Sequence, residues 1–493
     1  MAKVRIIVNI YLFLFAFAAF AQEPAQPVRL ELPFNTAETS VEVQALPDSS
    51  LLVYHKTANV WNTRAEFFFT KYNHKLEEVW RTAVDIPPRH EFVRCFTELP
   101  YTYMIFSSDV AEEYIFTRTN ILNGRTDTRK YELKDINAIH EFNVLQGNYF
   151  LIGSNRFSNK PLLLHLKPGD EKPRQLPSVY GEESTFSDML ADLENRRLDV
   201  VLTESNGRVS RLQVKSFNSD GELLSNKFIL QQNDKSLLNA EISPGDSAQK
   251  MLLGTYGTRD LRFTSGFFTT PVASVYSHGD FYSVLQLKNF LKYMRPRREE
   301  RTRARETERL RAGKEPQYRF RILLHDLIVT PTGYVLAGEV YYPQYRNNLT
   351  QLSLERRQAF GQQTEGYKRT HAVAMGFDKE GNLLWDNTFP LKDVSTLDLV
   401  HAVEVAHTRD GRVVMAYPEE EKIIYKVMRE DKFEDKERNL EIMTYNESDK
   451  IQLTEYPGII RWYDNHFVAF GFQRVKPAGT EARSVFYLNK ISF

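Results

Sequence analysis

The chain has 493 residues, with 64 lysines and arginines, 64 aspartates and glutamates, and a single cysteine, Cys95. This length requires several domains or one large fold of repeated units, and a hydrophobic content of 42% is enough for a core. The balanced charge excludes a protein that binds nucleic acid with its whole surface. The single cysteine excludes a disulfide scaffold and a zinc module built from cysteines.

The N-terminus has the features of an export signal. Lys3 and Arg5 precede an apolar run over 6–21, which closes on the small-x-small pattern Ala19-Phe20-Ala21. The run is short for a membrane span, and no later stretch approaches 18 apolar residues. We therefore predict a signal peptide over 1–21, cleavage near Ala21, a mature chain without a transmembrane span, and a periplasmic or extracellular location. An uncleaved anchor is the alternative.

Short alternating apolar runs separated by polar turns fill residues 35–493, with little helical periodicity. The first strands of successive units are expected to start near Ser40, His90, His140, Ser187, Asn239, His325, His401 and Gly458. Most intervals are close to 50 residues, and the two long ones hold a basic stretch at 288–316 and a long loop at 343–369. This pattern predicts an all-β protein, a β-propeller with eight four-stranded blades. Seven blades and two packed β-sandwiches are the alternatives.

The last unit, from Gly458, contains only three strand-like runs. The N-terminal segment 22–34 contains one more, VRLEL at 28–32. We expect this run to close the ring as the fourth strand of the last blade, because closure removes an open sheet edge.

Two hairpins share a sequence pattern. FNSDGELLSNKF at 217–228 and FDKEGNLLWDNTF at 377–389 each place an Asp-Gly or Glu-Gly pair at the turn, where glycine tolerates positive φ. The pattern resembles the hairpins of quinoprotein-like and related eight-bladed propellers, including a bacterial outer-membrane-assembly propeller. The whole chain also resembles uncharacterised exported propellers of Bacteroidota. These resemblances imply the propeller fold and no particular activity.

The stretch 288–314 contains 11 lysines and arginines against four acidic residues. Its Arg/Glu spacing predicts a helix that begins at Pro296 and ends before Gly313. A basic helix attracts anionic surfaces or an acidic partner, although it can equally be a solvated helix with no partner. The candidate contact residues are Arg297, Arg298, Arg301, Arg303, Arg305 and Arg309.

Four histidines stand at expected blade starts, and three of them precede an acidic residue. The first strand of a blade is innermost, so these side chains are expected to ring one mouth of the central channel. Imidazoles there can bind a divalent metal or an anionic ligand, or can hold adjacent blades together by hydrogen bonds. The candidate ligand-binding residues are His90, His140, His325 and His401.

The sequence contains no G-x-S-x-G, H-E-x-x-H, P-loop or G-x-G-x-x-G motif, and no catalytic residue or cofactor is predicted. We expect a non-catalytic exported propeller, a binding or scaffold component of a bacterial cell envelope. Its partner would be an envelope protein or an anionic envelope surface, and not nucleic acid. The alternatives are a propeller-type enzyme acting on polysaccharide (a lyase, glycosidase or metal-dependent hydrolase) and a sensor of a sugar or other small ligand.

Overall fold

The computed structural model describes most of the chain after the N-terminal segment. The described ranges are 23–58, 65–108, 112–158, 160–177, 184–230, 234–258, 260–273, 279–314, 317–345, 364–430, 432–433 and 437–493. The predicted signal peptide, 1–21, therefore lies outside the described residues.

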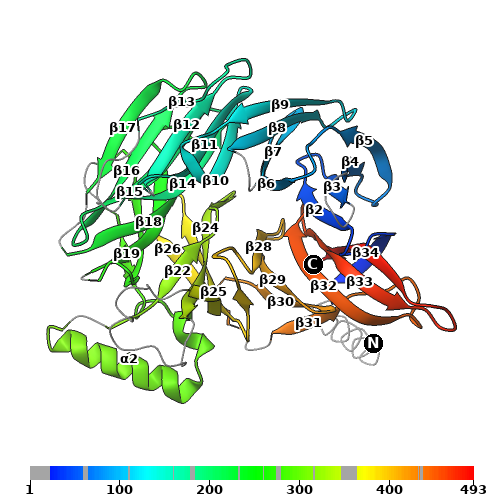
Figure 1. Cartoon of the computed structure of the whole chain (residues 1–493). Coiled ribbons are helices and arrows are strands. Elements are labelled where there is room, and N and C mark those ends of the chain that lie inside the picture. Colours follow the sequence, from blue (N-terminus) through cyan, green and yellow to red (C-terminus); the bar gives the residue numbers. More distant parts are fainter. Residues whose placement is uncertain are drawn as a thin grey trace, which may run out of the picture.

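The strands form eight antiparallel sheets arranged around a central axis, as Figure 1 shows. This confirms the predicted eight-bladed β-propeller. The first blade contains β2 (Thr39–Ala45), β3 (Leu51–Ala58), β4 (Ala65–Tyr72) and β5 (Glu78–Val84), and the second contains β6 (His90–Glu98), β7 (Tyr101–Ser108), β8 (Glu113–Asn120) and β9 (Thr126–Glu132). The third blade contains β10 (Ile136–Leu145), β11 (Asn148–Asn155), β12 (Pro161–Leu166) and β13 (Arg174–Gln175), and the fourth contains β14 (Thr185–Asp192), β15 (Arg197–Ser205), β16 (Ser210–Phe217) and β17 (Leu223–Ile229).

The second half of the ring contains the less regular blades. The fifth blade contains β18 (Ser236–Ile242), β19 (Met251–Gly257), β20 (Gly266–Pro271) and β21 (Phe281–Ser283). The sixth contains β22 (Arg321–Leu324), β24 (Gly333–Tyr345), β25 (Thr364–Asp378) and β26 (Leu383–Pro390), with the short β23 (Ile328–Thr330) and β27 (Ser395–Thr396) added. The seventh contains β28 (Glu404–His407), β29 (Val413–Glu419), β30 (Lys422–Met428) and β31 (Arg438–Glu441), and the eighth contains β32 (Lys450–Arg461), β33 (His466–Lys476) and β34 (Arg483–Ser492).

The eighth blade is completed by the other end of the chain. Strand β1 (Ala25–Leu32) pairs antiparallel with β34, so that Leu30 lies opposite Leu488. Arg29 reinforces this pairing, since its guanidinium donates hydrogen bonds to Gln473 and Asn489 at 2.9 and 3.0 Å. The two ends of the described chain are thereby held in one sheet, and the ring is closed.

Eight hydrophobic clusters hold the ring together, one at each junction between neighbouring blades. At the first junction Tyr54 and Phe69 of one blade pack against Phe106 of the next, with ring centroids 5.1 and 6.3 Å from Phe106. A blade therefore buries both faces of its sheet. This explains why strands such as β3 and β12 contain unbroken buried runs in place of an alternating pattern.

The two hairpins with a shared pattern lie between the third and fourth strands of their blades, as expected. Gly221 and Gly381 have φ of 70° and 90°, so both turns use the left-handed conformation that glycine tolerates. In the second hairpin the Asp378 carboxylate accepts a hydrogen bond of 2.7 Å from the amide of Asn382 and fixes the turn.

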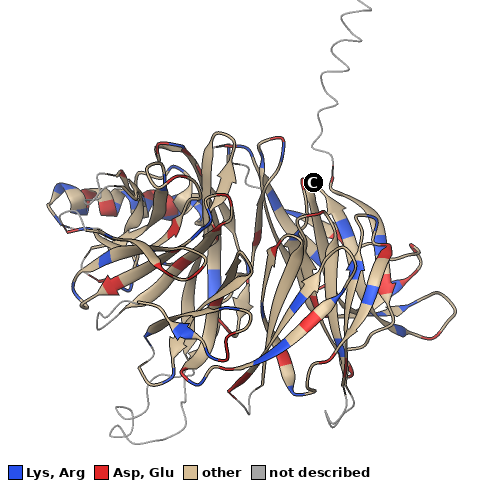
Figure 2. Cartoon of the chain, turned by 90° about the horizontal axis from the view of Figure 1, so that it is seen from above, with Lys and Arg blue, Asp and Glu red and all other residues tan. Residues whose placement is uncertain are grey.

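The basic insertion contains a helix, α2 (Pro296–Arg311), with Pro296 in its first turn and Gly313 beyond its end at φ of 65°. It follows the 3-10 helix η1 (Phe290–Tyr293), whose Phe290 and Leu291 are buried between the fifth and sixth blades. Figure 2 shows this helix at the edge of the ring, with basic and acidic residues interspersed along it.

The long loop expected at 343–369 is shorter than its predicted bounds. Residues 343–345 and 364–369 belong to β24 and β25, which remain paired out to Tyr345 and Thr364. The strands extend because their backbone groups continue the same antiparallel ladder beyond the point where the apolar pattern ends. The remaining residues of that loop lie outside the described chain.

Candidate functional site

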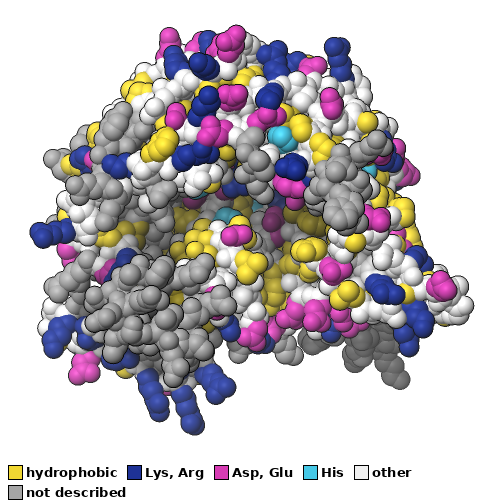
Figure 3. Space-filling view, in the orientation of Figure 1, with side chains coloured by type: hydrophobic (Ala, Val, Ile, Leu, Met, Phe, Trp, Pro, Cys, Tyr) yellow, Lys and Arg dark blue, Asp and Glu magenta, His cyan; other side chains and the backbone are white. Residues whose placement is uncertain are grey.

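A cavity of about 740 Å³ opens over the central channel and takes its walls from blades two to seven. Figure 3 shows this hollow at the centre of the ring, with histidine and acidic side chains on its walls. The polar and charged residues that line it are Arg94, His140, Glu141, Ser154, Ser184, Thr185, Ser187, Asp188, Asn239, Glu241, Asp326 and His401.

The innermost strands supply the acidic residues of this cavity. Glu141 lies on β10, Asp188 on β14 and Glu241 on β18, while Asp326 follows β22. The register of β10 and β14 shifts immediately before Glu141 and Asp188. Such bulges re-aim the side chain that follows them, which accounts for two carboxyl groups from neighbouring blades meeting at the channel.

Burial and neighbouring charges raise the pKa of three of these carboxyl groups. The pKa of Glu141 is raised to about 7, mainly by burial and to a smaller extent by the nearby Asp326 charge. Burial is also the main cause of the raised pKa of Asp188 and of Glu241, and Asp326 and Glu141 add to both effects. The Asp326 charge thus lies close enough to Glu141, Asp188 and Glu241 to disfavour their ionised forms.

Glu241 has the least favourable surroundings of this group. It is 6% exposed, and no hydrogen bond or ion pair to its carboxyl group is formed by any residue within the described ranges. By contrast, the Asp188 carboxylate accepts a 2.8 Å hydrogen bond from the amide of Ile242. Burying a carboxyl group without a partner costs free energy of folding, so Glu241 is the position in the wall where a positively charged partner is missing.

Arg94 on β6 is the one lysine or arginine among the described residues that line the cavity. Its guanidinium donates hydrogen bonds to the backbone carbonyls of His140 and Val93, at 3.1 and 2.8 Å. Its charge lowers the pKa of Glu141 and His140, in each case as a minor effect beside burial. The described part of the cavity wall therefore contains four carboxyl groups and one guanidinium.

Two of the four candidate histidines line this cavity. His140 places its Nε2 2.6 Å from the hydroxyl of Ser154, and burial lowers the pKa of this histidine. The Nε2 of His401 bonds to the carbonyl of Leu324 at 2.8 Å, and its pKa is lowered mainly by burial as well. Both rings are therefore held to protein groups, and burial disfavours their charged form.

His325 stacks on His401, with ring centroids 4.0 Å apart, and its Nε2 lies 3.2 Å from the Glu339 carboxylate. Glu339 is completely buried, and it also accepts hydrogen bonds from the amides of Ala402 and Val403. Burial would raise the pKa of Glu339, but the adjacent His325 ring and the Val403 amide outweigh it and lower the pKa. This cluster joins the sixth blade to the seventh.

His90 lies apart from the other three. It is 4% exposed, its Nε2 is 3.8 Å from Glu113, and it is not among the residues that line the cavity. The structure thus brings His325 and His401 together, places His140 on the same cavity as His401, and leaves His90 within its own blade. The described residues contain no group of three or more histidine, cysteine or acidic side chains arranged to hold a metal ion.

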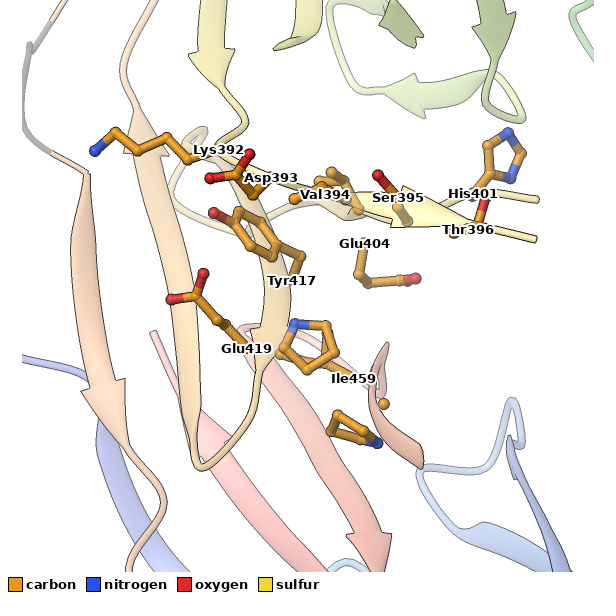
Figure 4. Close-up of a pocket in the computed structure, with 15 residues that line it drawn as sticks. Lys392, Asp393, Val394, Ser395, Thr396, His401, Glu404, Tyr417, Glu419 and Ile459 are labelled. Carbon is orange, nitrogen blue, oxygen red and sulfur yellow. The ribbon is translucent and has the colours of Figure 1, made fainter. Parts of the chain in front are cut away.

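A second cavity, of about 440 Å³, adjoins the first between the sixth, seventh and eighth blades. Figure 4 shows Glu404, Tyr417 and Glu419 on its walls, with His401 at its far end. Burial raises the pKa of Glu404, whose carboxylate accepts a 3.0 Å hydrogen bond from the amide of Arg461. The acidic character of the channel therefore continues into this smaller cavity.

The six candidate arginines of α2 divide into two groups. Arg303 is turned inward and donates hydrogen bonds to the carbonyls of Leu285, Leu287 and Lys288, at 3.1, 3.0 and 3.0 Å. Arg305 and Arg309 pair with the buried Glu306. Arg297, Arg298, Arg301 and Arg305 are exposed, so Arg305 remains open to solvent although it contacts Glu306.

The sequence signal for the acidic cavity was present but indirect. Two of the four acids, Glu141 and Asp326, directly follow a candidate histidine, whereas Asp188 and Glu241 carry no motif. Sequence reasoning selected the histidines and missed the acids, because one sequence does not reveal which side chains of separate blades converge. Arg94 and Ser154 were missed for the same reason.

No helix among the described residues is both long and apolar enough to cross a membrane.

No family model matches the chain, and no curated protein sequence matches it. Among solved structures, the polysaccharide lyase Uly1 is similar over 95% of this chain and 99% of its own, with 11% identity and a TM-score of 0.42. Prolyl oligopeptidase B from Galerina marginata is similar over 90% of this chain and 56% of its own, with 8% identity and a TM-score of 0.41. The β-propeller domain of the Trilobed protease from Pyrococcus furiosus is similar over 83% and 99%, with 6% identity and a TM-score of 0.37. These likenesses carry no argument about function.

Proposed function

We propose that the protein is a binding propeller whose channel cavity receives the positively charged group of a ligand, an ammonium or a guanidinium. The observation that carries this proposal is Glu241, a residue that is 6% exposed and has no hydrogen-bond or ion-pair partner among the described residues, beside three further acidic residues. A bound cation would supply the missing charge and hydrogen bonds, and it would favour the ionised form of Glu141, Asp188 and Glu241.

The cavity gives less support to an enzyme acting on polysaccharide. The described residues of the wall offer a polyuronate chain one cationic side chain, Arg94, beside four carboxyl groups, which disfavours the lyase form of that alternative. His140 and Ser154 form a close pair in the wall, but the imidazole contact alone supplies neither an oxyanion site nor a third group to orient the ring. Binding is therefore the function that the geometry supports best.

The test is calorimetric titration of the protein with spermidine and with the peptide acetyl-Gly-Lys-Gly-amide. We expect both to bind, and we expect Glu241→Gln to weaken binding at least tenfold. Because a bound cation displaces protons from the acidic group, titration at pH 6.5 in buffers of different ionisation enthalpy should reveal proton release.

The matched control is Glu171→Gln, which removes one exposed carboxyl group from the loop before β13. This control should bind both probes like the parent protein. If neither probe binds to the parent, or if Glu241→Gln and Glu171→Gln bind equally well, the proposal is wrong.

We further propose that the protein works after export, as a binding or scaffold component of a bacterial cell envelope. Sequencing the N-terminus of the protein recovered from an envelope fraction should give Gln22 as the first residue. A chain that retains residues 1–21 and stays in the cytoplasm would contradict this.

The outer face of α2 is our proposed contact with an anionic lipid surface of the envelope. Arg297, Arg301 and Arg305 recur at every fourth position along a helix of 16 residues, about 24 Å long, and therefore form one straight row. Arg297→Glu with Arg301→Glu should abolish salt-sensitive binding to phosphatidylglycerol vesicles. The parent protein should not bind phosphatidylcholine vesicles. Failure of the parent to bind the anionic vesicles would contradict the lipid contact and would favour an acidic protein partner.

A further inference from the structure

The cavity over the channel has an apolar side as well as an acidic one. The apolar side comes from the segment 395–401, which runs from β27 to β28 and which we call the strap. Leu399 and Val400 of the strap line the cavity. The exposed fractions of Leu397, Leu399 and Val400 are 83%, 37% and 53%. Three large apolar side chains are thus presented to solvent, and two of them line the same cavity as the four acidic residues.

The strap is fixed from beneath by a buried arginine. Arg369 is 1% exposed, and its guanidinium donates hydrogen bonds to the Thr396 hydroxyl and the Val400 carbonyl. The Thr396 hydroxyl in turn donates to the carbonyl of Asp398 at 2.5 Å. Since Arg369 also pairs with the buried Glu339 at 3.2 Å, the strap is attached to the interior of the sixth blade.

This attachment explains why the apolar side chains stay exposed. A loop that was free to move would turn its leucines toward the protein, whereas the strap is held through the Thr396 hydroxyl and the Val400 carbonyl. A fixed backbone with exposed apolar side chains is a preorganised contact surface, because binding to it orders little additional chain.

The cavity is too large for a lone cation. Its volume of about 740 Å³ lies in the range of sites for ligands of substantial size. Glu141, Asp188 and Glu241 stand on strands of blades three to five, and the strap connects blades six and seven, so the two kinds of wall come from different parts of the ring. A ligand that fills the cavity therefore meets both walls at once.

We infer that the cavity binds a peptide segment in which a lysine or arginine is adjacent to a large apolar residue. This inference rests on the proposed cation site. The basic side chain approaches Glu241, and the apolar side chain packs on Leu399 and Val400. Asn239 and Ser154, which also line the cavity, provide polar side chains for the amides of the peptide backbone.

The test compares two peptides, acetyl-Gly-Lys-Leu-Gly-amide and acetyl-Gly-Lys-Ser-Gly-amide, by calorimetric titration. The parent protein should bind the leucine peptide about 5- to 10-fold more tightly, as expected for partial burial of one leucine side chain. The double variant Leu399→Ser with Val400→Ser should lose this preference while its affinity for the serine peptide stays unchanged. The control, Leu224→Ser on the outer strand β17, changes a similarly exposed leucine (57%) and should keep the preference.

The outcomes separate this inference from the proposed function. Equal binding of both peptides by the parent protein, or a preserved preference in the strap variant, overturns the strap contact and leaves the cation site intact. If neither peptide binds to the parent, both proposals fail together. Because both substituted side chains are at least one-third exposed, the variant should fold, and its urea unfolding curve checks this.

Discussion

Replacing Glu141 by glutamine removes one of the four carboxyl groups from the cavity and should stabilise the protein at neutral pH. Burial and the Asp326 charge raise the pKa of Glu141 from 4.5 to about 7. The folded state therefore holds a proton that the unfolded state releases between these two pH values. Because the folded-state pKa of this carboxyl group is raised, the free energy of unfolding falls as pH rises from about 4.5 to about 7. Above about pH 7 this group lowers it no further.

The size of the effect follows from the shift. Each pKa unit corresponds to about 1.4 kcal/mol, so a rise from 4.5 to about 7 sets a ceiling of about 3 kcal/mol at pH 8. Glu141 is only partly buried by surface area, and we expect solvent to reduce the gain to about 1–2 kcal/mol. The glutamine oxygen can keep the 3.2 Å hydrogen bond from the amide of Phe142.

The assay is urea unfolding of the parent protein and the Glu141→Gln variant between pH 4 and pH 8. The two unfolding free energies should agree at pH 4 and separate in favour of the variant as pH rises. Glu171→Gln, on the surface, should give curves parallel to those of the parent at every pH. A variant that is no more stable than the parent at pH 8, or that gains equally at pH 4, would refute the electrostatic account of the cavity.

Three other perturbations address the ring, the helix and the strap. Deleting residues 23–32 removes β1 and exposes the edge of β34, so gel filtration should show self-association that the full chain lacks. Arg303→Ala should cost about 1–3 kcal/mol in urea unfolding, since three backbone carbonyls lose their donor, whereas the exposed Arg301→Ala should cost less than about 0.5 kcal/mol. Arg369→Met leaves the buried Glu339 without one of its partners and should cost about 3 kcal/mol. The backbone amides of the strap should then exchange hydrogen faster, as read by mass spectrometry.

Much of the ring could be predicted from the sequence because each blade is built largely from local contacts. Alternating runs and turn residues define hairpins between neighbours in the chain, and their recurrence about every 50 residues predicts repeated sheets. Glycine turns at 221 and 381, and the helix from Pro296, rest on similarly local rules. The predicted bounds of the long loop, 343–369, were too wide, because β24 and β25 remain paired out to Tyr345 and Thr364 and ladder pairing does not require apolar residues.

The candidate site was less predictable because its residues belong to different blades. Which side chain of an innermost strand faces the channel depends on bulges such as those before Glu141 and Asp188, and a bulge has no clear signal in one sequence. His90 and His140 share the same local pattern, yet one is buried beside Glu113 and the other lines the cavity.

The same distinction applies to the basic helix. The sequence determined that 296–311 would be helical and rich in charge. Only the tertiary structure decided that Arg303 faces the carbonyls beneath it while Arg301 remains exposed.

The sequence by itself thus determined the repeat, the strands, their turns and the inserted helix, because hydrogen bonding and burial within a blade act between residues close in the chain. The tertiary structure decided the chemistry of the channel. Glu141, Asp188, Glu241 and Asp326 influence one another only after ring closure brings four blades around one axis. The free energy of such a site depends on distances between strands that the local pattern does not encode.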